Sequence, residues 1–179
     1  MIFIVDEVQT GLGATGKLWA HEHFDLPNPP DIMTFAKKMQ IGGYFYRDNL
    51  KIDQPYRIAN TWLGDPIRIV FLEATLDAIR RDKLIELNRD IGKYLIDHLK
   101  AFCKQYPHLI DSARGLGTFS SFDGATSEIR DKIIQKLKNS GIQCGACGDK
   151  TMRIRPSLTF TQKHADIFLD RFEKVLKSF

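Results

Sequence analysis

The stretch that decides the fold lies at the start of the chain, where residues 2–11 read IFIVDEVQTG. A short unbroken apolar run before two acids is typical of a strand that is covered on both faces in an α/β sheet. Asp6 then stands at the carboxyl end of this strand, where open α/β sheets usually bind ligands. Burial of its carboxylate is costly unless a positive group pairs with it, and the alternative is an exposed acid at the end of a strand.

The rest of the first half continues this pattern and then changes to a helical one. Residues 31–35 (DIMTF) and 42–46 (GGYFY) are two further apolar runs, which we expect to form strands of the same sheet. From Pro66 to Leu99 the apolar residues recur at helical spacing. This spacing predicts one long helix, or two helices that join near Asp82.

The last third is mixed. Residues 117–122 and 152–154 are strand candidates, and residues 127–139 and the amphipathic stretch from Ile167 to Leu176 are helix candidates. The sequence therefore predicts part of an α/β domain followed by a smaller α+β domain, with a boundary between about 85 and 100.

Composition limits the class of protein. The chain is 43% hydrophobic and 27% charged with a net charge of +4, which is typical of a soluble globular protein. This charge suits an anionic small molecule but is too small to indicate nucleic acid or a membrane. No run approaches the roughly 18 apolar residues of a membrane span, and the first residues resemble neither a signal nor a transit peptide. Three cysteines are too few for a disulfide scaffold and suggest a reducing compartment.

Residues 11–17, GLGATGK, match two nucleotide-binding patterns in part. They fit the dinucleotide pattern, and they fit the phosphate loop up to its last position, where Leu18 replaces the serine or threonine that holds magnesium. A dinucleotide loop follows its strand directly and opens a helix, whereas residues 6–10 intervene here. We regard both matches as accidental.

Lys37 and Lys38 follow the second apolar run and precede Gly42 and Gly43. A lysine just after a buried strand can hold its amine in a partly dry pocket, where desolvation favours the neutral amine that attacks carbonyls. The alternative is a solvated turn.

Two further segments carry candidate anion-binding groups. Thr61 lies in a loop ahead of a helix, where a hydroxyl either donates to a phosphate or stabilises a turn. Arg153 and Arg155 point to the same side of an extended segment. They either grip a carboxylate or face solvent.

Candidate metal ligands are sparse. Cys144 and Cys147 have the spacing of zinc and redox sites but supply only half a zinc site. His21 and His23 share a face of an extended segment, yet no further ligand is near them in the sequence. We expect no metal site.

Taken together, these segments resemble the class III aminotransferases, which are fold-type I enzymes that use pyridoxal 5'-phosphate. The similarity runs along the full chain, and it is greatest to the animal branch that acts on 4-aminobutyrate. The segments that carry it are residues 6–11 (DEVQTG), 15–17 (TGK), 19–23 (WAHEH), 31–37 (DIMTFAK), 60–66 (NTWLGDP) and 147–150 (CGDK).

The resemblance implies a role for five residues. Asp6 would pair with the pyridine nitrogen of the cofactor, and Gln9 would lie near its phenolic oxygen. Lys37 would form the Schiff base and then move the proton of the substrate carbon. Thr61 would donate to the cofactor phosphate, in this family across a dimer interface. Arg153 would bind the carboxylate of 2-oxoglutarate or glutamate.

The spacing leaves a choice between the two lysines. The distance to Gly42 and Gly43 favours Lys38, whereas the distance from the preceding strand favours Lys37. We take Lys37, because the strand fixes side-chain direction and a loop absorbs one extra residue easily.

The resemblance also implies an organisation and an activity. We expect residues 1–90 to be part of a large cofactor-binding α/β domain that ends in a long interdomain helix, and residues 91–179 to be a small α+β domain. The implied reaction is transamination between 4-aminobutyrate and 2-oxoglutarate in a homodimer of the mitochondrial matrix. Transamination of ornithine or another ω-amino acid, and a non-catalytic remnant that dimerises, are the alternatives. The family's other cofactor-binding segments precede this region, so we expect a fragment of a larger enzyme.

Overall fold

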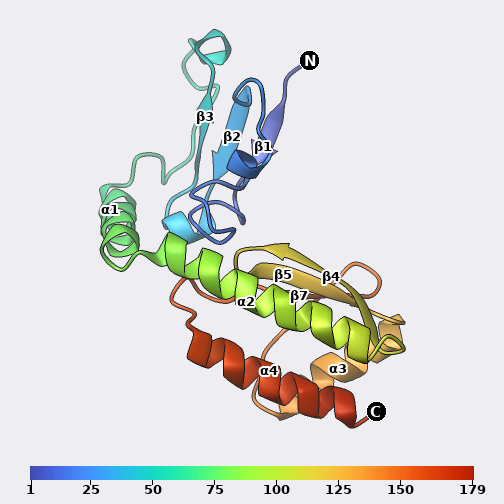
Figure 1. Ribbon diagram of the computed structural model, residues 1–179. Helices are drawn as coiled ribbons and strands as arrows, with labels where there is room; N and C mark the ends of the chain where they lie inside the picture. The colour runs from blue at the N-terminus through green and yellow to red at the C-terminus, as the bar shows by residue number, and fades with distance from the viewer. The chain divides into compact units, whose positions relative to one another are not determined.

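The computed structural model describes all residues from 1 to 179, and the chain forms two compact units (Figure 1). Unit 1 comprises Met1–Gly13 and Lys17–Leu84, and unit 2 comprises Ala14–Gly16 and Ile85–Phe179. The domain boundary that we expect between residues 90 and 91 stays a prediction.

Unit 1 contains a three-stranded sheet in the order β1-β2-β3. β1 (Ile4–Asp6) runs parallel to β2 (Ile32–Phe35), and β3 (Gly43–Tyr46) runs antiparallel to β2. These are the three strands that the apolar runs predict. Three short 3-10 helices lie between and after them: η1 (Ala20–His23), η2 (Lys37–Met39) and η3 (Asp48–Leu50).

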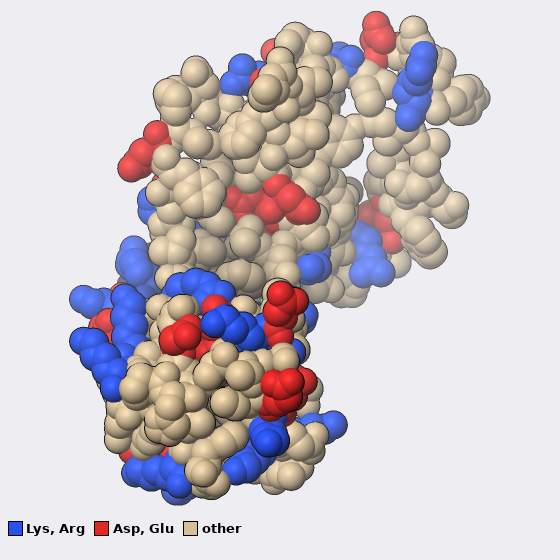
Figure 2. Space-filling model, turned by 90° about the vertical axis from the view of Figure 1, so that its right-hand side faces the viewer, with Lys and Arg blue, Asp and Glu red and all other residues tan.

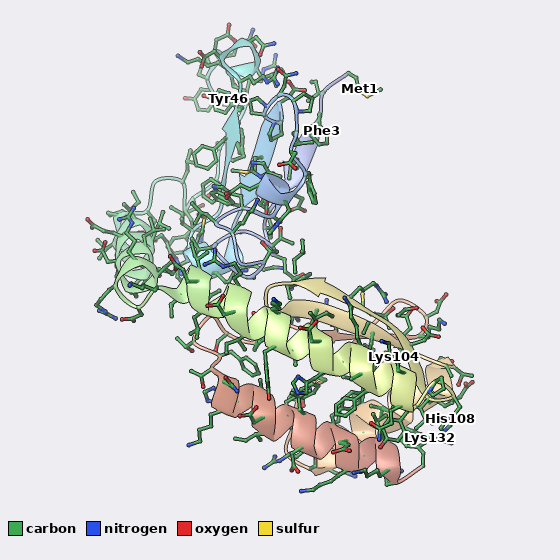
Figure 3. All side chains as sticks on the ribbon, viewed as in Figure 1. Met1, Phe3, Tyr46, Lys104, His108 and Lys132 are labelled. Atoms are coloured by element: carbon green, nitrogen blue, oxygen red, sulfur yellow. The ribbon has the colours of Figure 1, made fainter.

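The strands of unit 1 are not covered on both faces, so this part of the prediction is wrong. Ile2, Phe3, Ile4 and Phe45 are each about half exposed. The physical reason is that the only α-helix of unit 1, α1 (Pro66–Arg81), packs against η2 instead of over the strands. Figure 2 shows that most of the visible surface of the upper part of the molecule, which belongs to unit 1, is uncharged, apart from a central group of acidic side chains. Phe3 and Tyr46 lie at the same end of the sheet (Figure 3).

The helical stretch consists of two helices, α1 and α2 (Leu84–Gln105), which decides between the two alternatives. Asp65 caps α1, because its Oδ1 accepts a hydrogen bond from the Ile67 backbone nitrogen at 3.0 Å. Pro66 occupies the first turn, where its missing N–H is harmless. Lys83, with a φ of 49°, separates the two helices.

Unit 2 contains a four-stranded antiparallel sheet in the order β4-β5-β7-β6. Its strands are β4 (Ile110–Leu116), β5 (Phe119–Gly124), β6 (Gly145–Cys147) and β7 (Thr151–Ile154), and its other helices are α3 (Ser127–Asn139) and α4 (Gln162–Lys177). The predicted strands near residues 117–122 and 152–154 and both predicted helices are confirmed.

The core of unit 2 forms where its helices meet this sheet. Leu95 and Leu99 of α2 are fully buried, as the helical spacing requires. Phe172 of α4 lies at the centre, with its ring centroid 5.0 Å from Phe122 and 5.5 Å from Phe168. All members of the chain's buried hydrophobic cluster lie in unit 2.

Helix α2 passes very close to the β4–β5 turn, and two glycines make this possible. A Cβ atom at Gly92 would lie 2.1 Å from the carbonyl carbon of Gly117. We therefore expect Gly92→Ala to lower the free energy of unfolding by roughly 1–3 kcal/mol, which is the usual cost of overpacking. Urea unfolding followed by circular dichroism measures this change.

The matched control is Lys93→Ala, at the next and exposed position of α2. Alanine favours a helix at both positions, so helix propensity alone would not destabilise either variant. A Gly92→Ala variant that is as stable as the wild type, or more stable, would contradict this packing.

Candidate functional site

The carboxyl ends of β1 and β2 meet at one edge of the sheet of unit 1, because the two strands are parallel. Asp6 lies opposite Thr34, and the Glu7 backbone nitrogen donates to the Thr34 carbonyl oxygen at 3.0 Å. Lys37 follows two residues after the end of β2. The structure thus brings Asp6 and the lysine pair to the edge at which α/β sheets bind ligands.

Asp6 is exposed, which decides between the two alternatives for this acid. Its Oδ1 accepts hydrogen bonds from the Val8 backbone nitrogen at 2.9 Å and from the Thr34 hydroxyl at 3.1 Å. These bonds orient the carboxylate and leave it able to pair with a cation.

The buried acid of this edge is Glu7, which sequence reasoning missed. It is 2% exposed and accepts hydrogen bonds from the Thr10 hydroxyl at 2.5 Å and from the His21 backbone nitrogen at 2.8 Å. His21 Nδ1 lies 3.0 Å from the same carboxylate. Burial alone would raise the pKa of Glu7, but the hydrogen bonds from Thr10 and His21 outweigh it and hold the pKa below its ordinary value. The one sequence feature that could have indicated this role is Thr10, three residues after Glu7, whose hydroxyl can reach the carboxylate.

We expect Glu7→Gln to destabilise unit 1 by roughly 1–3 kcal/mol at pH 7, because the amide leaves buried donors without an anionic acceptor. Since the folded pKa is depressed below the ordinary value of 4.5, the carboxylate stabilises the fold above about that pH and loses this effect as the pH falls through the folded pKa. The difference between the variant and the wild type should therefore shrink in acid. Thermal unfolding from pH 3 to 7 checks this, with the exposed Glu73→Gln of α1 as control. A constant difference across this range would contradict the role.

The two lysines point to different surroundings. Lys38 is partly buried, and its Nζ donates to the Gln9 carbonyl oxygen. Burial, and then the charge of Lys37, lower the pKa of Lys38. The partly desolvated amine that the sequence predicts at this edge is therefore Lys38, whereas Lys37 is exposed.

Lys37 itself lines a cavity of about 490 Å³. Its φ of 52° is in the left-handed region, which is an unfavourable conformation for a residue other than glycine. The remaining walls come from the segment after β2 and from the loop before α1: Ala36, Gln40, Ile41, Gly42, Asn60, Trp62, Leu63, Gly64 and Arg68.

This cavity carries positive charge without any acid. Lys37 and Arg68 are its only charged lining residues. Thr61 is exposed and is not itself a wall residue, but its neighbours Asn60 and Trp62 are. A cavity of this size, with an exposed amine and a guanidinium, fits an anionic aldehyde such as pyridoxal 5'-phosphate.

The fifth predicted residue, Arg153, belongs to unit 2, whereas the other four belong to unit 1. It lies on β7, and its Nε is shielded from solvent without a protein acceptor. It lines a second cavity, of about 500 Å³, within unit 2.

The glycine-rich residues 11–17 do not have the geometry of a nucleotide loop. The backbone nitrogens of Leu12 and Gly13 donate to the Leu18 carbonyl oxygen at 2.7 and 3.2 Å, so they are not directed at a phosphate. Lys17 Nζ donates to the Glu22 carbonyl oxygen at 2.7 Å. The 3-10 helix η1 follows, and no α-helix opens here.

No group of three or more His, Cys, Asp or Glu side chains is placed to hold a metal ion. None of the helices combines the length and the apolar character that crossing a bilayer requires.

The two cysteines of the C-x-x-C segment differ in environment. Cys147 is exposed on β6, whereas Cys144 is only partly exposed, and burial raises the pKa of its thiol to about 11. Since the thiolate is the nucleophile, we expect iodoacetamide at pH 8 to label Cys147 about a hundred times faster than Cys144. Peptide mass spectrometry over time measures both rates. The rates should converge in urea, and equal rates in the folded protein would contradict the burial of Cys144.

The parallel pair β1–β2, the lysine edge and the separate α+β unit define a fold-type I aminotransferase, and residues 1–176 match the family model Aminotransferase class-III. The chain belongs to this family, whose cofactor is pyridoxal 5'-phosphate. The predicted family and fold class are thereby confirmed.

Particular relatives share the sequence along nearly the whole chain. It is 46% identical to the probable mitochondrial 4-aminobutyrate aminotransferase of Caenorhabditis elegans, over 99% of this chain and 37% of that protein. It is also 46% identical to the mitochondrial 4-aminobutyrate aminotransferase of Homo sapiens, over 99% of this chain and 35% of that protein. The chain thus spans just over a third of the length of these relatives.

Solved structures agree in fold. A lysine aminotransferase from M. tuberculosis superposes with a TM-score of 0.91 at 30% identity, over 98% of this chain and 41% of that one. An ornithine aminotransferase from Plasmodium yoelii gives 0.88 at 28% identity, over 99% of this chain and 48% of that one.

Proposed function

We propose that this chain serves the transamination of 4-aminobutyrate with 2-oxoglutarate, with pyridoxal 5'-phosphate as cofactor. The observation that carries the proposal is Lys37, which lines a cationic cavity. Asp6 lies at the same carboxyl edge of the sheet but is not among the walls of this cavity. The 46% identity to 4-aminobutyrate aminotransferases supports this choice of amino donor.

The bound cofactor supplies the electron sink for the reaction. Lys37 would hold the cofactor through its amine and would move a proton at the substrate carbon. Asp6, held by Thr34 and the Val8 backbone, presents a fixed negative charge to the cofactor's ring nitrogen. Lys38 fixes the backbone at Gln9 through the Gln9 carbonyl oxygen, which sets the position from which the Gln9 side chain reaches the ring.

Two further residues bind anionic groups in this proposal. Thr61 donates its hydroxyl to the cofactor phosphate, and its place in the loop that borders the Lys37 cavity supports this role. Arg153 binds the carboxylate of 2-oxoglutarate or glutamate, which its unmatched buried Nε supports. A homodimer in the mitochondrial matrix belongs to the same proposal, in line with the mitochondrial names of the animal relatives.

A second candidate is transamination of ornithine, lysine or another ω-amino acid. The superposition on the lysine and ornithine aminotransferases favours it. Turnover measured with 4-aminobutyrate, ornithine, lysine and β-alanine as donors separates the candidates, and we expect the highest kcat/KM for 4-aminobutyrate.

The assignment of the lysine is tested by covalent trapping. The protein is incubated with pyridoxal 5'-phosphate and reduced with borohydride, and the modified peptide is mapped by mass spectrometry. We expect the label at Lys37, and Lys37→Ala should lose it with at least a tenfold drop in trapped cofactor.

Lys38→Ala is the matched control, because it removes the neighbouring amine and leaves the one in the cavity. It should still be labelled at Lys37. Labelling of Lys38 in the wild type, with none at Lys37, would overturn the assignment.

A further inference from the structure

The second cavity lies entirely within unit 2 and has the chemistry of an anion site. Its volume is about 500 Å³, within the range of small-molecule pockets. Its walls come from the segment before β6, from β7 and the residues after it, and from the first turns of α4: Gly141, Ile142, Gln143, Cys144, Gly145, Arg153, Ile154, Arg155, Pro156, Phe160, His164, Ile167 and Phe168.

Two guanidinium groups line this cavity without any carboxylate. Neither Arg153 nor Arg155 forms an ion pair, and no Asp or Glu is among the walls. Arg114 and Arg130 of unit 2 are paired, with Asp123 at 2.9 Å and with Asp131 at 2.6 Å, whereas Arg171 forms no ion pair and donates to the Ser140 carbonyl oxygen. The two guanidinium groups of the cavity likewise lack a protein counter-charge, and unlike Arg171 they line a cavity.

The Arg153 Nε gives an independent indication of a ligand. This atom is shielded from solvent and donates to no protein acceptor. A buried donor without an acceptor is unfavourable, and an anion in the cavity that Arg153 lines would compensate the charge of its guanidinium.

The spacing of Arg153, on β7, and Arg155, the first residue after β7, allows both arginines to act on one ligand. Residues two apart on an extended segment point to the same side, and their Cα atoms are roughly 6.6 Å apart. Both side chains are long enough to bridge that distance. A small molecule in the cavity would therefore meet both positive charges.

The other walls favour an aliphatic ligand body. Ile142, Phe160 and Ile167 contribute apolar surface, and the Phe160 ring stacks on His164 with centroids 5.6 Å apart. The segment after Arg155 is anchored, because the buried Asn88 side chain donates to the Leu158 carbonyl oxygen at 2.7 Å. The cavity thus combines apolar walls with two cations, and the chain segment that follows it is anchored.

We propose that Arg155 is a second substrate-contacting residue, which acts with Arg153 to select short aliphatic dicarboxylates over monocarboxylates of the same length. The proposal deepens the proposed function and rests on it for the identity of the ligand as the acidic amino acceptor. Two positive charges without a protein counter-charge favour a dianion, because each carboxylate of a diacid can meet a guanidinium.

The test compares two acids of equal chain length, glutarate and pentanoate, by calorimetry and by amide chemical shifts of the whole chain. We expect glutarate to bind more tightly than pentanoate. Arg155→Gln should weaken glutarate about tenfold and pentanoate less than about twofold, since it removes one charge-assisted contact. Arg153→Gln should weaken both acids.

Lys132→Gln is the charge-matched control, because this exposed lysine of α3 is not a wall residue (Figure 3). It should leave both affinities unchanged. Arg155→Lys retains the charge and should retain the preference for glutarate, which separates charge from a loss of folding. An unchanged preference in Arg155→Gln, or no binding of glutarate to the wild type at 10 mM, roughly a hundredfold above an ordinary KM, would overturn the proposal.

The outcome can be told apart from that of the proposed function, because glutarate binding needs no cofactor. If Lys37 is labelled but Arg155→Gln does not change the preference for glutarate, this inference is wrong and the proposed function stands. A glutarate preference without labelling at Lys37 would retain a dicarboxylate site and remove its link to transamination.

Discussion

The parallel pairing of β1 with β2 is the constraint on which the candidate site depends. Because the strands run in the same direction, Asp6 and the residues after Phe35 reach the same edge of the sheet. A hydrogen bond from the Glu7 backbone nitrogen to the Thr34 carbonyl oxygen extends this pairing one residue beyond β1. A shift of one residue would turn Asp6 to the other face and separate it from Thr34.

The turn after β1 is held by groups that take no part in the proposed chemistry. Glu7 is buried and connects Thr10 to His21, and Lys38 connects the second strand end to Gln9. The acid pair Asp6 and Glu7 and the lysine pair Lys37 and Lys38 thus show the same difference between their two members. In each pair one residue fixes the backbone, and the other, Asp6 or Lys37, remains exposed to a ligand.

The sequence predicts most of the fold because apolar periodicity is a strong signal where elements are long. The strands β1, β2 and β3 and the helices α3 and α4 follow the predicted runs closely. β4 escapes prediction because its residues, IDSARGL, do not alternate, and a register shift between Asp111 and Arg114 interrupts its pairing. β6 is three residues long and gives no pattern of its own.

The site was predictable in its residue types but less so in its environments. Exposure of Asp6 and burial of Glu7 depend on which side of the strand end each faces, and three-residue β1 is too short for alternation to reveal it. The different surroundings of Lys37 and Lys38 depend on the left-handed backbone at Lys37. The cavity around Arg155 depends on contacts between distant segments, which no local pattern encodes.

The β1–β2 pairing is tested most directly by nuclear magnetic resonance, through the scalar coupling across the hydrogen bond from the Glu7 nitrogen to the Thr34 carbonyl. We expect a measurable coupling, together with slow exchange of the Glu7 amide hydrogen, because this bond lies at the junction of the two strands. Absence of the coupling together with rapid exchange of that amide would show that the strand ends do not meet there.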